Sequence, residues 1–236
     1  MIRLLDAEPD FVAQLGEQER DQVARHLLLP TVTVDAGPWD VRALDSAHGV
    51  EGKALGFLVL EGVIAMKVAV AGRTCTRLIL AQDLLLLDGV EDDVLPLRWS
   101  WAAIERATLV VFDQRLMVVT RRWPSLMTAI INRGALQARH ALLQQAISQL
   151  PRVEDRLLGL LWAVADRRGV VRGSQIRIDL AITHETFAEL IGARRPTVSL
   201  GLKKLAEDGL VSQDSRGWLI ARDSLDNFRA SLSGGH

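Results

Sequence analysis

The sequence predicts an α+β protein with a β-roll over residues 1–122, a long helix over 123–150 and a helical domain over 151–236. Short apolar runs recur between residues 31 and 119, and turn-forming residues interrupt them about every ten positions, which is typical of a small barrel or roll. A helical stretch opens at Pro124, which suits a first helical turn, and stops at Pro151. Two short amphipathic helices and a hairpin pattern follow between Thr183 and Ile220.

Residues 3–29 are expected to form short capping helices, because their apolar positions stand singly among charges. These positions are Leu15, Val23, Leu27 and Leu28. The apolar runs that follow predict separate strands at residues 32–34, 57–60, 63–68, 77–80, 84–87 and 108–112.

The helix predicted over residues 123–150 carries apolar or small residues at a 4-3-4-3 spacing, which is the pattern of a coiled-coil seam. These positions are Met127, Ile131, Gly134, Ala138 and Ala141. Further apolar residues lie off this seam at Ile130, Leu143, Ile147 and Leu150. A single helix packed on its own β-roll would need only one apolar face. A homodimer accounts better for two apolar faces, because the second face would then pack against the partner helix.

The domain after Pro151 is expected to begin with a helix over residues 153–166. Thr183 is a good N-cap for a later, short helix whose apolar residues, Phe187, Leu190 and Ile191, define one buried stripe. Gly192 supplies the positive φ that ends such a helix.

A second short helix follows at once and has a strongly basic exposed face. Its buried stripe is predicted to consist of Val198, Leu202 and Leu205, and the segment 194–204 holds four basic residues and no acidic one. Two core helices of another α-rich domain would also show amphipathic patterns. The glycine turn, the basic opening and the hairpin expected over residues 210–220 instead favour a helix-turn-helix that presents its second helix to DNA.

The stretch ITHETFAELIGARRPTVSLGLKKLAEDGLV resembles the DNA-binding domain of the Crp/Fnr family of bacterial transcription regulators. The shared pattern is Thr, a helix with Ala and Leu, Gly at the turn, a basic residue, Thr-Val-Ser, and then Leu-Lys-x-Leu-x-x-x-Gly-Leu. The strand, glycine and strand of LEGVIAMKV, followed by RLILAQDLLLL, are similar to the core of the family's cyclic-nucleotide-binding β-roll, a jelly roll that precedes the winged helix.

The resemblance implies a DNA-binding surface on the helix-turn-helix and the wing. Its expected residues are Thr183, His184, Arg194, Arg195, Thr197, Ser199, Lys203, Lys204 and Arg216. In the family the residue matching Arg195 contacts a guanine, and the next residue, a glutamate that accepts from a cytosine, is Pro196 here. A further family arginine is replaced by Leu200, so we expect a site other than the usual TGTGA half-site.

The residues that bind a cyclic nucleotide in this family are not present as a set. The family's phosphate cassette has Gly-Glu and then Arg-Ser/Thr-Ala, and the first pair is missing from LLLLDG after Gln82-Asp83. Arg98 lies within about one place of the cassette arginine, so it is the one candidate ligand-binding residue. It stands among Trp99 and Trp101, which would share one face of a strand and serve either core packing or an apolar pocket.

Other cofactors and enzymatic chemistry find no support in the sequence. One cysteine, Cys75, excludes an iron–sulfur cluster held by four cysteines of one chain, and it is expected to be an ordinary strand residue. The five histidines lack metal-ligand spacing, and Gly-rich phosphate loops, nucleophile elbows and His-Glu-x-x-His are absent. The acidic run 91–93 is expected to be a solvated loop. We therefore expect neither a cofactor nor an enzyme.

The distribution of charge agrees with DNA binding by the C-terminal half. Residues 151–236 carry 13 Lys+Arg against 11 Asp+Glu, whereas residues 1–150 carry 15 against 18. No apolar run approaches the roughly 20 residues of a membrane span, and the N-terminus lacks the apolar stretch of a signal peptide, so a cytoplasmic protein is expected.

The sequence thus predicts a homodimeric, sequence-specific transcription regulator that binds inverted-repeat double-stranded DNA without a cyclic nucleotide, with RNA polymerase as a further implied partner. Two alternatives stay open. One is a β-roll that docks a protein partner without sequence-specific DNA reading, and the other is a cyclic-nucleotide-responsive regulator with an atypical pocket.

Overall fold

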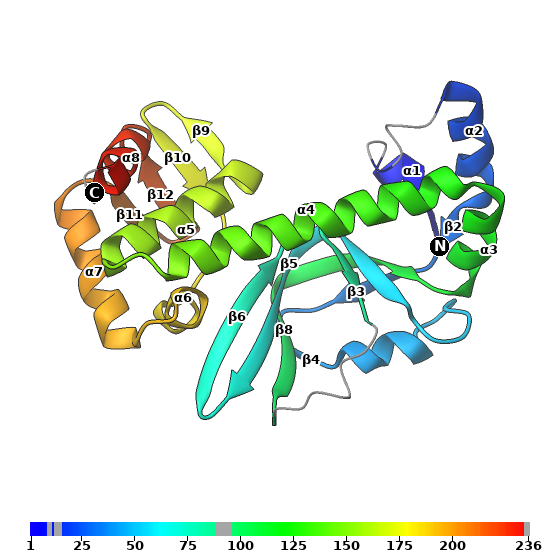
Figure 1. Ribbon diagram of the computed structural model, residues 1–236, viewed down its shortest axis with the longest axis horizontal. Coiled ribbons are helices and arrows are strands. Elements are labelled where there is room, and N and C mark those ends of the chain that lie inside the picture. Colours follow the sequence, from blue (N-terminus) through cyan, green and yellow to red (C-terminus); the bar gives the residue numbers. More distant parts are fainter. Residues whose placement is uncertain (9–10, 12–15, 88–95, 234–236) are drawn as a thin grey trace. The chain divides into compact units, whose positions relative to one another are not determined.

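The computed structural model describes residues 1–8, 11, 16–87 and 96–233, and it confirms an α+β chain with an N-terminal sheet and a C-terminal helix-turn-helix domain (Figure 1). The chain divides into two compact units. The first holds residues 1–73 and 77–139, and the second holds 74–76 and 140–236. The division falls inside one continuous helix, α4 (Pro124–Ser148).

The first unit is built on a six-stranded antiparallel sheet. Its path runs β3-β8-β5-β6, and β4 pairs with β8 while β7 pairs with β5. The strands are β3 (Thr31–Val34), β4 (Gly37–Trp39), β5 (Gly56–Val70), β6 (Arg73–Ile79), β7 (Leu84–Leu86) and β8 (Arg98–Phe112).

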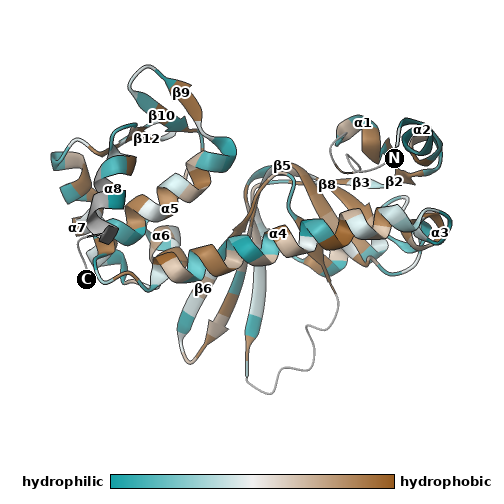
Figure 2. Ribbon diagram, turned by 45° about the horizontal axis from the view of Figure 1, so that its top comes forward, coloured by the Kyte–Doolittle hydropathy of each residue, from teal (hydrophilic) through white to brown (hydrophobic). Residues whose placement is uncertain are grey.

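The long strands β5 and β8 are buried on both faces at residues 56–59 and 109–112, which explains the continuous apolar runs there. Alternate residues enter two separate cores, as the pleat requires. Phe57 and Val111 belong to one core, and Leu58 and Phe112 belong to the other. Figure 2 shows the hydrophobic colouring concentrated along β5 and β8.

The prediction of separate strands at residues 57–60 and 63–68 was wrong, because both lie in the single strand β5. Gly62 marks an irregularity within that strand, where the register against β8 shifts between Val59 and Ile64. Its φ is +87°, and a Cβ there would lie 2.4 Å from the backbone oxygen of Arg106. The glycine thus permits a bulge and a close backbone approach rather than a turn.

Short helices border the sheet. They are α1 (Leu4–Ala7), α2 (Glu17–His26), the 3₁₀ helix η2 (Val41–Ser46) and α3 (Gln114–Arg122), and β1 (Ile2–Arg3) pairs with β2 (Leu28–Leu29). The capping helices expected over residues 3–29 are therefore confirmed only in part, because Leu28 belongs to a strand and is exposed. Val23 and Leu27 are buried, and Leu15 and the acidic run 91–93 lie outside the described residues.

The helix α4 matches the expected span but not every expected contact. Ile130 and Ile147 are buried, whereas Leu143 is half exposed, so the second apolar face is less complete than predicted. On the predicted seam, Ile131 is 61% exposed and Met127 is 37% exposed. Ala138 is also exposed, while Gly134 and Ala141 are half-buried.

The second unit combines the end of α4 and the four helices α5–α8 with a four-stranded sheet of order β11-β12-β10-β9. Its elements are α5 (Val153–Arg168), β9 (Val170–Arg172), β10 (Gln175–Ile178), α6 (His184–Ile191), α7 (Arg195–Glu207), β11 (Val211–Asp214), β12 (Gly217–Ala221) and α8 (Ser224–Ser233). The hairpin expected over residues 210–220 is confirmed as β11–β12, whereas the sequence did not predict β9 and β10. In the described ranges no helix is long and apolar enough to cross a membrane.

Candidate nucleic-acid interface

The first helix of the motif, α6, begins and ends as its sequence predicts. The hydroxyl of Thr183 accepts a hydrogen bond from the backbone amide of Thr186 at 3.1 Å, which satisfies one of the free amides of the first turn. Phe187, Leu190 and Ile191 are buried. Gly192 ends the helix with a φ of +65°, and this left-handed residue turns the chain toward α7.

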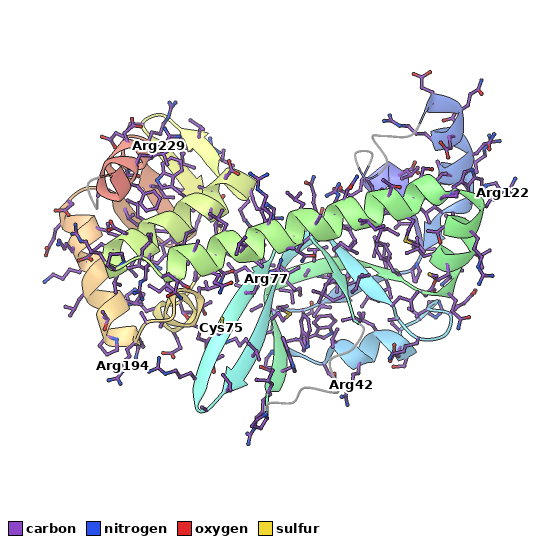
Figure 3. All side chains as sticks on the ribbon, viewed as in Figure 1. Arg42, Cys75, Arg77, Arg122, Arg194 and Arg229 are labelled. Carbon is purple, nitrogen blue, oxygen red and sulfur yellow. The ribbon has the colours of Figure 1, made fainter. Side chains whose placement is uncertain are left out.

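The second helix, α7, opens with its basic residues exposed. Arg194 is the N-cap residue, Arg195 is the first helical residue, and both are exposed. Pro196 lies in the first turn, where no helical hydrogen bond is lost. Thr197 and Leu200 are exposed as well, and Leu200 has 70% of its surface open. Figure 3 shows Arg194 at the start of α7 with its side chain directed outward.

Close packing against α5 determines which face of α7 is exposed. Val198, Leu202 and Leu205 are buried. Gly201 lies beside them, and a Cβ there would be 3.0 Å from Leu157 and 3.2 Å from Val153 of α5. Gly201 was not among the predicted residues, although its place next to the apolar stripe of a helix could have indicated a close approach of two helices.

A polar contact joins the two helices of the motif. Nδ1 of His184 lies 2.9 Å from the hydroxyl of Ser199, which in turn donates to the backbone oxygen of Arg195 at 3.1 Å. Both side chains are half-buried. This contact connects the start of α6 to the first turns of α7, so His184 and Ser199 position α7 in addition to the DNA contacts predicted for them.

The two lysines of α7 each meet a carboxylate. Lys203 lies 3.6 Å from Glu207, and Lys204 lies 3.4 Å from Glu154 of α5. The pKa of Glu154 is below its usual value, because its own backbone amide donates to the carboxylate and Lys204 is close. The Lys203 pair is largely exposed, and such pairs stabilise a fold by only about 0–1 kcal/mol, so Lys203 can exchange partners. In the second pair the side chain of Lys204 is half exposed and that of Glu154 is mostly buried.

The β11–β12 hairpin is held by an ion pair that the sequence analysis did not predict. Arg177 of β10 donates to Asp214 at 2.7 Å, and the other carboxylate oxygen of Asp214 accepts from the backbone amides of Arg216 and Gly217. The hydrogen bond from Arg177 lowers the pKa of Asp214. Trp218 of β12 is buried and meets Phe187 of α6 edge to face at 5.1 Å. Arg216 is left exposed at the turn.

The remaining predicted residues lie away from the helix-turn-helix. Arg98 is exposed at the first position of β8. Trp101 packs edge to face against Trp39 and Phe57, so it serves the core, whereas Trp99 is 36% exposed. Cys75 is an exposed residue of β6. Within the described ranges, no group of three His, Cys, Asp or Glu side chains could hold a metal ion.

Comparison with known proteins supports this assignment of the C-terminal domain. Residues 152–227 match the Crp-like helix-turn-helix domain. A putative HTH-type transcriptional regulator, ycf28 of Porphyra purpurea, is 25% identical over 105 residues, which are 44% of this chain and 44% of that protein. The match thus spans less than half the length of this curated relative.

Solved structures resemble nearly the whole chain. A double mutant of CooA from Carboxydothermus hydrogenoformans has a TM-score of 0.65 at 17% identity, and the match covers 86% of this chain and 87% of that one. A cyclic nucleotide-binding domain containing protein from Listeria monocytogenes has a TM-score of 0.67 at 16% identity, with 93% and 98% covered. At these identities the likeness shows a shared fold.

Proposed function

We propose that this chain, which joins a Crp-like helix-turn-helix domain at residues 152–227 to the β-sheet domain fold of Crp/Fnr regulators, is a DNA-binding transcription regulator. It binds inverted-repeat operators as a homodimer, in the cytoplasm, and needs no cyclic nucleotide to do so. RNA polymerase is its further partner. The protein acts by binding and not by catalysis.

The exposed basic N-terminal turn of α7 is the observation that carries this proposal. Arg194 and Arg195 project from the N-terminal end of the helix, where a recognition helix contacts base edges. No acidic residue occurs between Arg194 and Lys204, so this surface attracts phosphates. The hairpin β11–β12 supplies the wing, with Arg216 at its turn.

The side chains around Arg195 support recognition of an unusual half-site. Arginine can donate two hydrogen bonds to one guanine in the major groove. Pro196 offers no polar group for the next base, and the exposed Leu200 offers an apolar side chain that suits a thymine methyl group. Neither side chain can make the polar base contacts of the glutamate and the arginine that it replaces, so the preferred half-site is expected to differ from TGTGA.

Independence from cyclic nucleotides is supported by the first unit. Arg98, the one candidate phosphate ligand, is exposed at the beginning of β8. The positions after Asp83, where the family has Gly-Glu, carry the apolar residues Leu84–Leu87. Neither feature provides the buried set of donors that a cyclic phosphate and a ribose hydroxyl require.

The test begins with selection of bound sequences from random double-stranded DNA by the full-length protein, followed by titration of the selected site. Arg195→Ala is expected to weaken binding to that site by about 1–3 kcal/mol, because a bidentate base contact is lost. Arg121→Ala removes a similar charge from the exposed surface of α3 and is the matched control.

Four outcomes would contradict parts of the proposal. Failure to enrich any sequence would favour the partner-docking alternative. Equal losses for Arg195→Ala and Arg121→Ala would remove Arg195 from the interface. Enrichment of TGTGA repeats would contradict the altered readout. A tenfold or larger gain in affinity on adding cyclic AMP or cyclic GMP would establish a cyclic-nucleotide-responsive regulator.

A further inference from the structure

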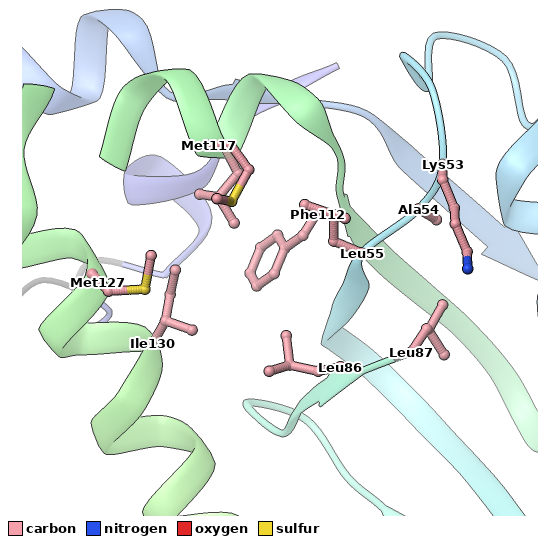
Figure 4. Close-up of a pocket in the computed structure, with 10 residues that line it drawn as sticks. Lys53, Ala54, Leu55, Leu86, Leu87, Phe112, Met117, Met127 and Ile130 are labelled. Atoms are coloured by element: carbon pink, nitrogen blue, oxygen red, sulfur yellow. The ribbon is translucent and has the colours of Figure 1, made fainter. Parts of the chain in front are cut away.

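The first unit contains an apolar pocket of about 300 Å³ that none of the functions above uses. It is lined by the segment 53–55 before β5, the end of β7, the end of β8, α3 and the first turns of α4. Figure 4 shows Phe112, Leu86 and Ile130 around its middle and Lys53 at the end near Leu87. Its volume is at the lower limit of the roughly 300–1,000 Å³ that ligand pockets occupy.

The floor of the pocket is buried and apolar. Ala54, Phe112, Leu116 and Ile130 line it, and each is at most 8% exposed. Protein interiors are close-packed, so empty spaces much larger than a water molecule are few in a domain. A space lined in this way offers water few hydrogen-bond partners and favours apolar molecules.

The mouth of the pocket is apolar as well. Leu86 is 57% exposed, Met117 is 43% exposed and Met127 is 37% exposed. Three large apolar side chains gathered at one opening differ from singly scattered exposed residues and are typical of binding sites. Two of them are methionines, whose flexible thioethers adapt to ligands of irregular shape.

Lys53 is the one charged residue among the ten that line the pocket. Its side chain is exposed, so the ammonium group remains hydrated while its stem borders the apolar wall. A ligand that fits must therefore be mostly apolar and can gain from one negative charge at its end.

We infer that this pocket binds a small amphipathic organic acid, with the aliphatic or aromatic body against Phe112 and Ile130 and the carboxylate beside Lys53. The site lies wholly within the first unit and is independent of the DNA-binding helix. Because Met127 and Ile130 belong to α4, the ligand contacts the helix that carries the predicted dimer seam.

The test is calorimetric titration of the full-length protein with decanoate and with decanol, both below their aggregation limits and without DNA. Saturable binding of one molecule per chain is expected for both probes. In Lys53→Met the ratio of decanoate affinity to decanol affinity falls about two- to fivefold, because an exposed ion pair contributes little. Lys53→Arg and Arg121→Met keep the wild-type ratio.

Two variants fill the pocket with a larger side chain, one from β7 and one from α4. If one of them fails to fold, the other still tests the site. Leu86→Trp and Met127→Trp change exposed positions at the mouth, and each is expected to reduce affinity for both probes at least tenfold. Wild-type affinities in both folded variants, or an unchanged affinity ratio in Lys53→Met, would overturn the site. Because the measurement contains no DNA, its failure leaves the proposed DNA binding untouched.

Discussion

Gly62 and Gly72 allow two effects to be separated at the scale of single residues. Both have positive φ, at +87° and +75°. A Cβ at Gly62 would meet the backbone oxygen of Arg106 at 2.4 Å, whereas a Cβ at Gly72 would meet nothing within 4 Å. Gly62 is therefore required both by its positive φ and by the lack of room for a side chain, whereas Gly72 is required by its positive φ alone.

Alanine substitution at these two positions measures the difference. Gly72→Ala is expected to destabilise the fold by about 1–2 kcal/mol, the strain of a left-handed residue with a side chain. Gly62→Ala adds about 1–3 kcal/mol, because the neighbouring strand must move away. Urea unfolding of both variants gives the comparison, and equal losses would show that β8 yields to the added methyl group at no cost.

Asp113 predicts a specific dependence of stability on pH. Its buried carboxylate accepts from the backbone amides of Glu51 and Arg115 and pairs with the Arg115 guanidinium at 2.5 Å. Burial alone would raise the pKa of Asp113, but the hydrogen bonds from Arg115 and from these amides outweigh it, so the pKa lies below 3.8. The stabilisation is therefore complete above the ordinary aspartate pKa and is lost as the pH falls through the lowered one.

Asp113→Asn tests this assignment. The variant is expected to lose about 1–3 kcal/mol at pH 7, because amide and guanidinium donors lose their charged acceptor. Its stability should also fall less than that of the wild type on acidification. Asp35→Asn, at an 88% exposed side chain, is the control and should behave like the wild type in urea unfolding at each pH.

At the scale of elements, we predict that Lys203 of α7 and Arg216 of the wing contact phosphates rather than bases. Lys203 and Arg216 lie on different elements and are both exposed. Replacing either with alanine is expected to weaken binding to all sequences alike and to reduce the salt dependence of log K by about one unit. Titrations over a range of salt concentrations measure this slope, and a wild-type slope in either variant would remove that side chain from the phosphate contacts.

The helix-turn-helix and the wing could be predicted from sequence because their signals are local. Thr183, Gly192 and the stripe of Val198, Leu202 and Leu205 act within a few residues of one another. The continuity of β5 could not be predicted, because it depends on Arg106 and its neighbours in a distant strand. The ion pair of Arg177 with Asp214 was missed for the same reason, since its members are 37 residues apart.

At the scale of the whole molecule, the predicted homodimer depends on the exposed face of α4. Exposed apolar or small residues occur there at Ile131, Ala135, Ala138 and Leu142, and this 4-3-4 spacing overlaps the predicted seam at two positions. The exposed row contains Ala135 and Leu142 in place of the predicted seam positions Gly134 and Ala141, which are half-buried. We predict that a second copy of the chain covers this face, because coiled-coil pairing buries such a row.

Ala138→Glu tests the dimer, since it would bury a charge in the seam. We expect dissociation into single chains and a large loss of operator affinity, because each half-site loses the benefit of the linked one. Asn132→Glu places the same charge on another exposed part of α4 and should leave both properties unchanged. Light scattering beside DNA titration gives the readout, and a dimeric Ala138→Glu that still binds would place the dimer elsewhere.

The long pairing of β5 with β8 has a consequence for synthesis on the ribosome. Gly56 pairs with Phe112, so at roughly 5–20 residues per second the partner is made about 3–11 s later. β6 follows β5 directly and covers one of its edges early, but the other edge waits for β8. During that interval the largely apolar, 15-residue strand β5 has one open edge, which makes the nascent chain prone to pair with other chains and aggregate.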